Sequence, residues 1–250
     1  MMSLAGRVAI VTGAANGIGR AVALALARER ARVVVCDIDG EGAFKVAEEI
    51  AGGNGECLAF QVDVTNAQDI DRLVAQTLDQ SDRIDFLVNN AGIAGDAKFT
   101  DLTENQWRRM LDVNLTSMFL CCKAIVPVMI DQGAGKIVNA SSQAAFDGSS
   151  EAAHYAASKA GVIGLTRSLA RELGPHNITV NLIAPGIIQT AMNPAERLKA
   201  KGEGWLKRLP LKRFGLPEDV AEVVLFLLSD AADYITGQSI LINGGMRMGA

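Results

Sequence analysis

The stretch "RVAIVTGAANGIG" (residues 7–19) runs from a short apolar segment into a turn that contains three glycines. Residues 7–12 are apolar and β-branched, which favours a buried strand, and residues 18–30 have the pattern of a helix. Gly13, Gly17 and Gly19 tolerate backbone angles closed to other residues and let the main chain approach a diphosphate. The helix behind them offers free N–H groups and the positive end of its dipole. The stretch predicts a strand–turn–helix unit that binds a dinucleotide, although its G-x-x-x-G-x-G spacing also suits a structural turn.

Short apolar runs alternate with amphipathic stretches along the rest of the chain. Further strands are expected at 32–37, 57–64, 84–90, 136–141, 178–185 and 238–243, and helices at 41–51, 66–80, 104–131, 153–173 and 217–229. Strands that are apolar on both faces and separated by helices are typical of a parallel sheet covered on two sides. With right-handed crossovers, this pattern predicts an α/β fold with a Rossmann-type, doubly wound parallel sheet of about seven strands.

The chain has no linker, internal repeat or low-complexity segment, so residues 1–250 are expected to form a single domain. The segment 186–216 differs from the rest because it is long, charged and interrupted by prolines and glycines. Long irregular segments of compact domains are often lids or binding loops. We therefore expect a substrate-loop or lid segment at about 186–216.

Composition excludes several classes of function. Apolar residues make up 49% and charged residues 21% of the chain, and the formal charge is −4, which argues against broad nucleic-acid or membrane binding. No continuous run of 18 apolar residues occurs, and the N-terminus lacks a signal-peptide pattern, so we expect no membrane span and a cytoplasmic location. The four cysteines have no C-x-x-C spacing and only two histidines are present, so no metal site is expected.

The acid Asp37 ends the second expected strand, where a dinucleotide-binding fold places a carboxylate on the adenine ribose hydroxyls. A carboxylate there repels a 2′-phosphate, so Asp37 favours NAD over NADP. Asp39 lies close by and could share the task. Arg20 is the main residue that argues against this preference for NAD, although its position in the helix also suits a side chain that faces solvent.

Later motifs resemble one known family. In the expected order, the chain contains "TGAANGIG" (12–19), Asp63, "NNAG" (89–92), Asn114, Ser142, "YAASK" (155–159) and "PG" at 185–186. Each motif is weak alone, but the combination is specific and covers essentially all 250 residues. The chain therefore resembles the short-chain dehydrogenase/reductase family, and within it the 3-oxoacyl-carrier-protein reductases.

The resemblance implies roles for the matching positions. The catalytic residues would be Asn114, Ser142, Tyr155 and Lys159, with Ser141 a less favoured alternative to Ser142. Asn114 would hold a water in a proton relay. The cofactor-binding residues would be Gly13, Asn16, Gly17, Ile18, Gly19, Asp37, Ile38, Asp63, Val64, Asn90, Ala91, Gly92, Tyr155, Lys159, Pro185, Gly186, Ile188 and Thr190.

Tyr155 and Lys159 are four residues apart and share one face of the expected helix. A free phenol has a pKa near 10, so it is a poor base at neutral pH. We expect the neighbouring ammonium and the cationic nicotinamide ring to lower the pKa of Tyr155 and allow it to act as an acid and base. Ser142 would hydrogen-bond the substrate oxygen, and the cofactor would carry the hydride.

The sequence narrows the substrate only to a class: a secondary alcohol or ketone, or an acyl thioester. The family's 3-oxoacyl reductases usually prefer NADP, whereas Asp37 indicates NAD. The basic stretch 197–213 is either a solvated amphipathic helix or a surface for carrier-protein or coenzyme A phosphates. Candidate substrate-binding residues are Ser142, Ala144, Tyr155, Gly186, Met192 and Trp205.

The leading interpretation is an NAD-dependent dehydrogenase that interconverts a secondary alcohol and a ketone. Its alternatives are an NADP-dependent 3-oxoacyl reductase and a non-catalytic NAD-binding sensor. The resemblance also implies a homo-oligomer, a tetramer or a dimer, with the helices around 104–131 and 153–173 in the interface. Small residues on the second helix, among them Gly161 and Gly164, would permit close contact between subunits or could pack internally.

Overall fold

The computed structural model of the chain describes residues 4–190, 192 and 195–249, with the backbone alone for 195–201. Its centre is a parallel sheet whose strands lie in the order β3-β2-β1-β4-β5-β6-β7. The strands are β1 (Val8–Thr12), β2 (Arg32–Asp37), β3 (Cys57–Gln61), β4 (Phe86–Asn89), β5 (Gly135–Ala140), β6 (Ile178–Pro185) and β7 (Ser239–Ile242). β2 and β3 lie on one side of β1, and β4 to β7 lie on the other side, as a doubly wound fold requires. The predicted fold class is confirmed.

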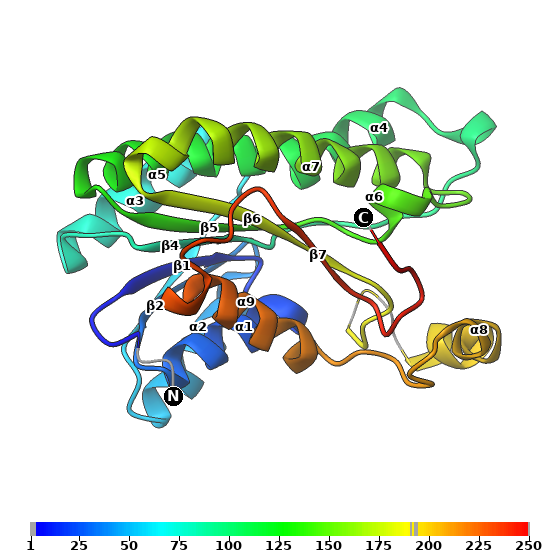
Figure 1. Cartoon of the computed structure of the whole chain (residues 1–250), viewed down its shortest axis with the longest axis horizontal. Helices are drawn as coiled ribbons and strands as arrows, with labels where there is room; N and C mark the ends of the chain where they lie inside the picture. The colour runs from blue at the N-terminus through cyan, green and yellow to red at the C-terminus, as the bar shows by residue number, and fades with distance from the viewer. Residues whose placement is uncertain (1–3, 191, 193–194, 250) are drawn as a thin grey trace.

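Helices cover both faces of this sheet (Figure 1). One face carries α1 (Gly17–Arg28), α2 (Gly40–Gly52) and α9 (Pro217–Leu228), and the other carries α3 (Ala67–Ser81), α5 (Ser117–Gln132) and α7 (Ala153–Leu173). All five residues of β1 are buried because side chains from both helical layers pack against it. This is why its sequence is continuously apolar rather than alternating.

The long helix expected at 104–131 has an internal irregularity. It comprises α4 (Glu104–Leu111), a π-helical turn (Asp112–Thr116) and α5, which contains Pro127. Glu104–Gln132 is long and apolar enough to cross a membrane by length and composition, with a mean hydropathy of 1.8 in its most apolar window. Core helices of soluble proteins pass the same test, and this helix packs against α3 and the sheet. The π turn carries Asn114, one of the candidate catalytic residues, and such turns are frequent at functional sites.

Several boundaries differ from the sequence prediction. β3 ends at Gln61 rather than 64, and β4 spans only Phe86–Asn89 instead of 84–90. Residues 62–64 and Asn90, beyond the carboxyl ends of these strands, line a cavity instead. The lid segment contains a helix, α8 (Ala195–Arg208), in agreement with the amphipathic pattern of 197–213. Residues 191, 193 and 194 of the lid lie outside the described part. A short helix, α6 (Ala144–Asp147), was not expected at all.

Candidate active site

The carboxyl edge of the sheet borders three cavities that share lining residues. The largest in the nucleotide half, the glycine-loop cavity of about 300 Å³, lies over the ends of β1, β2 and β4. The tyrosine cavity of about 120 Å³ lies beside Tyr155, and the lid cavity of about 460 Å³ lies between α6 and α8. Thr190 lines the first two, and Ser142 and Tyr155 line the last two. The three cavities thus form one continuous site with Tyr155 near its middle.

The glycine turn is held in a conformation that requires glycine. Gly13 has a φ of +64°, and a Cβ on it would lie 2.7 Å from the Ala91 Cα. A Cβ on Gly19 would lie 2.1 Å from the Gly13 carbonyl oxygen, so α1 can approach the turn only without a side chain there. Asn90 braces the turn, since its Nδ2 donates to the carbonyls of Thr12 (3.1 Å) and Gly13 (2.9 Å).

The start of α1 is suited to an anion. Its N-cap, Asn16, makes no side-chain capping bond, and the first turn contains no acidic residue. The first N–H groups of this helix are therefore available, and the dipole adds positive potential at the same point. A diphosphate fits this position in both charge and hydrogen bonding.

Asp37 lies at the end of β2 and lines the glycine-loop cavity. Its carboxylate accepts from the backbone N–H of Ala15 (2.9 Å) and of Asp39 (3.0 Å), which fixes it beside the glycine turn. Arg20, the residue that argues against NAD, instead forms an ion pair with Glu49 at 2.6 Å and does not line this cavity. Asp39 also lies outside the lining and caps α2 by accepting from Gly42 N–H.

Tyr155 and Lys159 project from the first part of α7 toward the ends of β4 and β5. Tyr155 and Ser142 line the same two cavities, and Ser142 is close enough to lower the pKa of Tyr155. The Lys159 Nζ donates to the carbonyl of Ala140 at 2.9 Å, and the side chain is buried. Ser141 and Ser142 make different contacts. The Ser141 hydroxyl donates to the Lys159 carbonyl at 2.8 Å and so connects the end of β5 to α7. Only Ser142 faces Tyr155.

Burial changes the proton affinity of both α7 groups. It raises the pKa of Tyr155 above its usual value, and the hydrogen bond with Ser142 only partly opposes this. It also lowers the pKa of Lys159 to about 8. In the protein alone, desolvation therefore dominates the pKa of Tyr155. The expected lowering of this pKa by Lys159 together with the cationic nicotinamide ring stays a prediction for the cofactor complex.

Asn114 lies in the π turn and is fully buried. Its Oδ1 accepts from Ile93 N–H at 2.8 Å, and its Nδ2 lies 3.1 Å from the Ser158 hydroxyl. A Cβ on Gly92 would lie 3.0 Å from the Asn114 Oδ1 and 3.2 Å from the Lys159 Nζ, so both side chains border this glycine. The π turn thus brings Asn114 next to Lys159.

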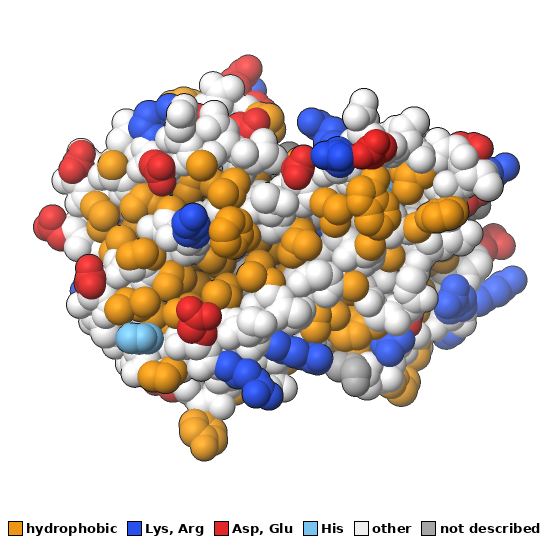
Figure 2. All heavy atoms as spheres, turned by 90° about the horizontal axis from the view of Figure 1, so that it is seen from above, with side chains coloured by type: hydrophobic (Ala, Val, Ile, Leu, Met, Phe, Trp, Pro, Cys, Tyr) orange, Lys and Arg blue, Asp and Glu red, His pale blue; other side chains and the backbone are white. Residues whose placement is uncertain are grey.

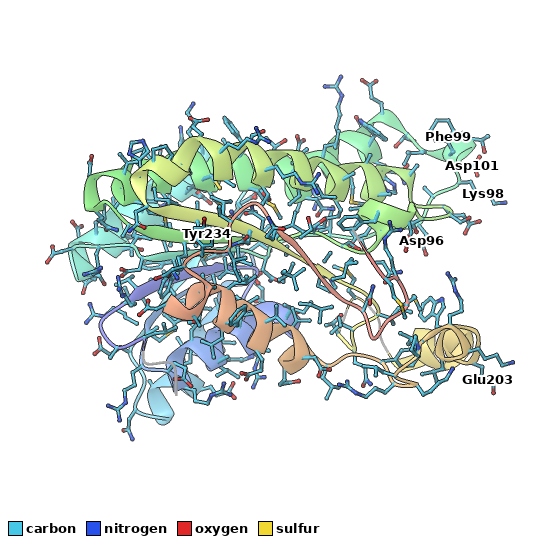
Figure 3. The ribbon with its side chains drawn as sticks, in the orientation of Figure 1. Asp96, Lys98, Phe99, Asp101, Glu203 and Tyr234 are labelled. Atoms are coloured by element: carbon cyan, nitrogen blue, oxygen red, sulfur yellow. The ribbon has the colours of Figure 1, made fainter. Side chains whose placement is uncertain are left out.

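Most of the candidate residues lie around these cavities. Of the proposed cofactor residues, all but Gly19 line the glycine-loop or tyrosine cavity, and Gly19 supports the turn from behind. All six candidate substrate residues line the lid cavity. In Figure 3, Asp96, on the loop after β4, lies above Glu203, on α8, at the end of the molecule that contains the lid cavity.

The structure adds lining residues that sequence reasoning missed. Arg109 and Val113 line the glycine-loop cavity, one turn apart on the helix that leads to Asn114, and that spacing could have identified them. Gln143, Arg208 and Met246 line the lid cavity. Met246 had no sequence signal, because it reaches the site only through the folding back of the C-terminal tail.

No group of three or more His, Cys, Asp or Glu side chains is arranged to hold a metal ion within the described residues. All four cysteines are free thiols, and three of them are buried. The chemistry of the site therefore has to be argued from its hydroxyl, amine and amide groups.

Comparison with known proteins agrees with this arrangement. The family model described as Enoyl-(Acyl carrier protein) reductase matches residues 13–247. The chain is 46% identical to a 3-oxoacyl-[acyl-carrier-protein] reductase of Synechocystis sp., over 99% of this chain and 100% of that protein. It is 44% identical to the corresponding reductase of Thermotoga maritima, over 98% and 99%.

Two solved structures superpose closely. The crystal structure of gox2181 has a TM-score of 0.95 at 37% identity and covers 98% of this chain and 97% of that one. A short-chain dehydrogenase/reductase (glucose/ribitol dehydrogenase) of Brucella melitensis has a TM-score of 0.93 at 35% identity and covers 99% of both chains. On this identity and coverage, the chain belongs to the short-chain dehydrogenase/reductase family and is an oxidoreductase that uses a nicotinamide cofactor.

Proposed function

We propose that the protein is an NAD(H)-dependent oxidoreductase that interconverts a secondary alcohol and a ketone, with Tyr155 as the general acid and base. The observation that carries this proposal is that Tyr155 and Ser142 together line both the tyrosine and the lid cavity, at the junction of the two. A carbonyl oxygen at this junction would meet two hydroxyl donors. The nicotinamide cofactor would supply the hydride and, in its oxidised form, a positive charge.

The charge states of the site favour proton donation during reduction. Because burial raises the pKa of Tyr155, the phenol is protonated at neutral pH and is ready to donate to a carbonyl oxygen. Ser142 would stabilise the negative charge that develops on that oxygen. In this proposal Lys159 would contact the cofactor ribose. Asn114, which borders Gly92 as Lys159 does, would help return a proton through water.

For the substrate, we propose a 3-oxoacyl or 3-hydroxyacyl thioester as the first class to test. The names of the two reductases from Synechocystis sp. and Thermotoga maritima support this class. The lid cavity supports it too, since it is about 460 Å³ in volume and Trp205 and Met192 supply apolar walls. Arg208 at the end of α8 could face a phosphate of the thioester carrier, although Asp96, Asp147 and Glu151 line the same cavity. A simple secondary alcohol or ketone stays the alternative.

The acid–base role is tested by Tyr155→Phe, which removes the hydroxyl and keeps the ring. We expect kcat for reduction of acetoacetyl-coenzyme A, followed by NADH absorbance, to fall about 10²- to 10⁴-fold. NADH affinity should change little, because Tyr155 does not line the glycine-loop cavity and the ring is kept. Tyr234→Phe is the matched control, since Tyr234 is fully exposed. Turnover of Tyr155→Phe near that of the control would rule out the role.

The activity of the wild-type protein separates the proposed enzyme from its alternatives. If it binds NADH but reduces neither the thioester nor a panel of ketones, the non-catalytic sensor is the better account. Reduction of ketones without reduction of the thioester would keep the acid–base proposal and reject only the proposed substrate class.

We propose NAD rather than NADP because Asp37 is the charged group beside the expected ribose position. Within the described residues that line the glycine-loop cavity, Arg109 is the only cation, and it projects from α4 rather than from the β2 edge. A 2′-phosphate near Asp37 would thus meet a carboxylate fixed by two backbone hydrogen bonds.

Asp37→Ala should shift cofactor preference. We expect the ratio of kcat/KM with NADH to kcat/KM with NADPH to fall about 10- to 100-fold, since a charge-assisted hydrogen bond is lost and a repulsion is removed. Asp39→Ala is the control, because Asp39 caps α2 and does not line the cavity. A wild-type enzyme that prefers NADPH, or a ratio unchanged by Asp37→Ala, would contradict the assignment.

We further propose a homo-oligomer, a tetramer or dimer, built through the face of α5 and α7. Figure 2 shows apolar side chains gathered over the helical layer that is uppermost in Figure 1. Phe119 on α5 is 47% exposed. Gly164 on α7 is also exposed, and a Cβ added to it would meet nothing within 4 Å. Gly161 packs within the subunit instead, because a Cβ on it would lie 2.6 Å from the Leu115 side chain.

The space beside Gly164 allows a sharp test. Gly164→Phe should fit within a single subunit yet obstruct a second one, so sedimentation should show a smaller assembly at unchanged secondary structure. Gly52→Phe at the end of α2, where a Cβ also meets nothing within 4 Å, is the control. A monomeric wild type, or an assembly unaffected by Gly164→Phe, would exclude this interface.

A further inference from the structure

The C-terminal tail folds back toward the segment that carries Ser142. After β7, two glycines with positive φ, Gly244 (+61°) and Gly245 (+83°), reverse the chain. Asn243 stabilises the reversal: its Oδ1 accepts from Gly245 N–H and its Nδ2 donates to the Arg247 carbonyl, both at 3.0 Å. The described part of the tail consequently reaches α6, where Arg247 pairs with Asp147 (Figure 1). The tail is thus a folded element with its own hydrogen bonds.

Arg247 makes two side-chain contacts with α6. Its guanidinium forms an ion pair with Asp147 and lies over the Phe146 ring, 5.4 Å from the centroid. The opposite oxygen of Asp147 accepts from Gln143 Nε2 at 2.8 Å. Burial opposes ionisation of Asp147, but the bonds from Gln143 and Arg247 outweigh it and lower the pKa of Asp147. One carboxylate therefore links the tail to both ends of α6.

α6 depends on tertiary contacts, with α7 as well as with the tail, because it has only four residues and isolated helices of that length are unstable in water. It begins two residues after Ser142, and Ala144 N–H lies 3.2 Å from the Ser142 hydroxyl. Gln143 N–H donates to the carbonyl of Pro185 at 3.0 Å. A shift of α6 would therefore move both Ser142 and the wall of the lid cavity, which Gln143 and Asp147 line.

We propose that Arg247 is a positioning residue: by holding Asp147 and Phe146, it fixes α6 and thereby the orientation of the Ser142 hydroxyl toward Tyr155. The tail clamp, defined here as Arg247, Asp147 and Phe146, rests on the proposed function of Ser142. It acts on the substrate side of the site. The glycine-loop cavity, on the far side of Tyr155, is unaffected by it.

Arg247→Ala tests the clamp. Because misplacement of a catalytic group by about 1 Å costs up to about 100-fold in rate, we expect kcat to fall about 10- to 100-fold. KM for NADH should stay within about 2-fold, since the clamp does not reach the glycine-loop cavity. Arg247→Lys should recover most of the rate, because it keeps a cation near Asp147 and Phe146.

The control is Arg28→Ala, which breaks another partly exposed ion pair between distant segments, Arg28–Glu222 at 2.7 Å. Both alanine variants should lower the melting temperature by no more than about 2–4 °C. Only Arg247→Ala should lower kcat. Wild-type kcat in Arg247→Ala, or equal losses in both variants, would overturn the proposal.

A double-mutant cycle tests whether the pair acts as a unit. Asp147→Ala should resemble Arg247→Ala, and the double variant should lose no more than about 3-fold beyond either single variant. If the loss of kcat in the double variant equals the product of the two single losses, the two residues act separately and the clamp is overturned.

Hydrogen exchange separates failure of the clamp from failure of the proposed function, because it needs no substrate. We expect the backbone amides of residues 142–148 to exchange faster in Arg247→Ala than in wild type or Arg28→Ala. Unchanged exchange there would reject the clamp even in an active enzyme. Faster exchange in a protein without carbonyl reductase activity would keep the clamp and reject the proposed function.

Discussion

The balance between burial and hydrogen bonding at Tyr155 is the interaction on which the site depends. Burial removes water from the phenol and raises its pKa, and the Ser142 hydroxyl offsets only part of that effect. Lys159 is buried as well, and its pKa falls to about 8. Burial thus disfavours the charged form of both groups, although a pKa of about 8 leaves Lys159 mostly protonated at neutral pH. A positive charge that arrives with the oxidised cofactor would shift this balance toward the phenolate, as proton abstraction from an alcohol requires.

The sheet creates this environment by bringing distant segments to one edge. β5 ends at Ala140, whose carbonyl accepts from the Lys159 Nζ, and the adjacent Ser141 hydroxyl donates to the Lys159 carbonyl. These two bonds lock the end of β5 to α7 and leave Ser142 facing Tyr155. On the nucleotide side, Asn90 ties the end of β4 to the glycine turn after β1. The proposed hydride and proton sites would therefore lie on neighbouring strand ends, which favours precise positioning.

Much of this arrangement could be predicted from the sequence, because it depends on local patterns. Continuous apolar strands, the glycine turn and the tyrosine–lysine spacing each leave a signal within a few residues, and they correctly indicated the fold class and family. Features that depend on contacts across the chain were not predictable in this way. α6 is too short to leave a periodic pattern, and the Arg247–Asp147 pair joins residues 100 positions apart. The raised pKa of Tyr155 in the protein alone was not predictable for the same reason: four-residue spacing shows that an amine is near, whereas desolvation depends on the whole fold.

The central claim is that the protein's own groups keep Tyr155 protonated and that the oxidised cofactor is needed to ionise it. The most direct measurement is NMR titration of tyrosine labelled with ¹³C at Cζ, in a Tyr234→Phe background where Tyr155 is the remaining tyrosine. The account predicts that Tyr155 stays protonated up to about pH 10 in the protein alone and ionises at lower pH in the NAD⁺ complex. Ionisation well below pH 10 in the protein alone, unchanged by NAD⁺, would contradict it.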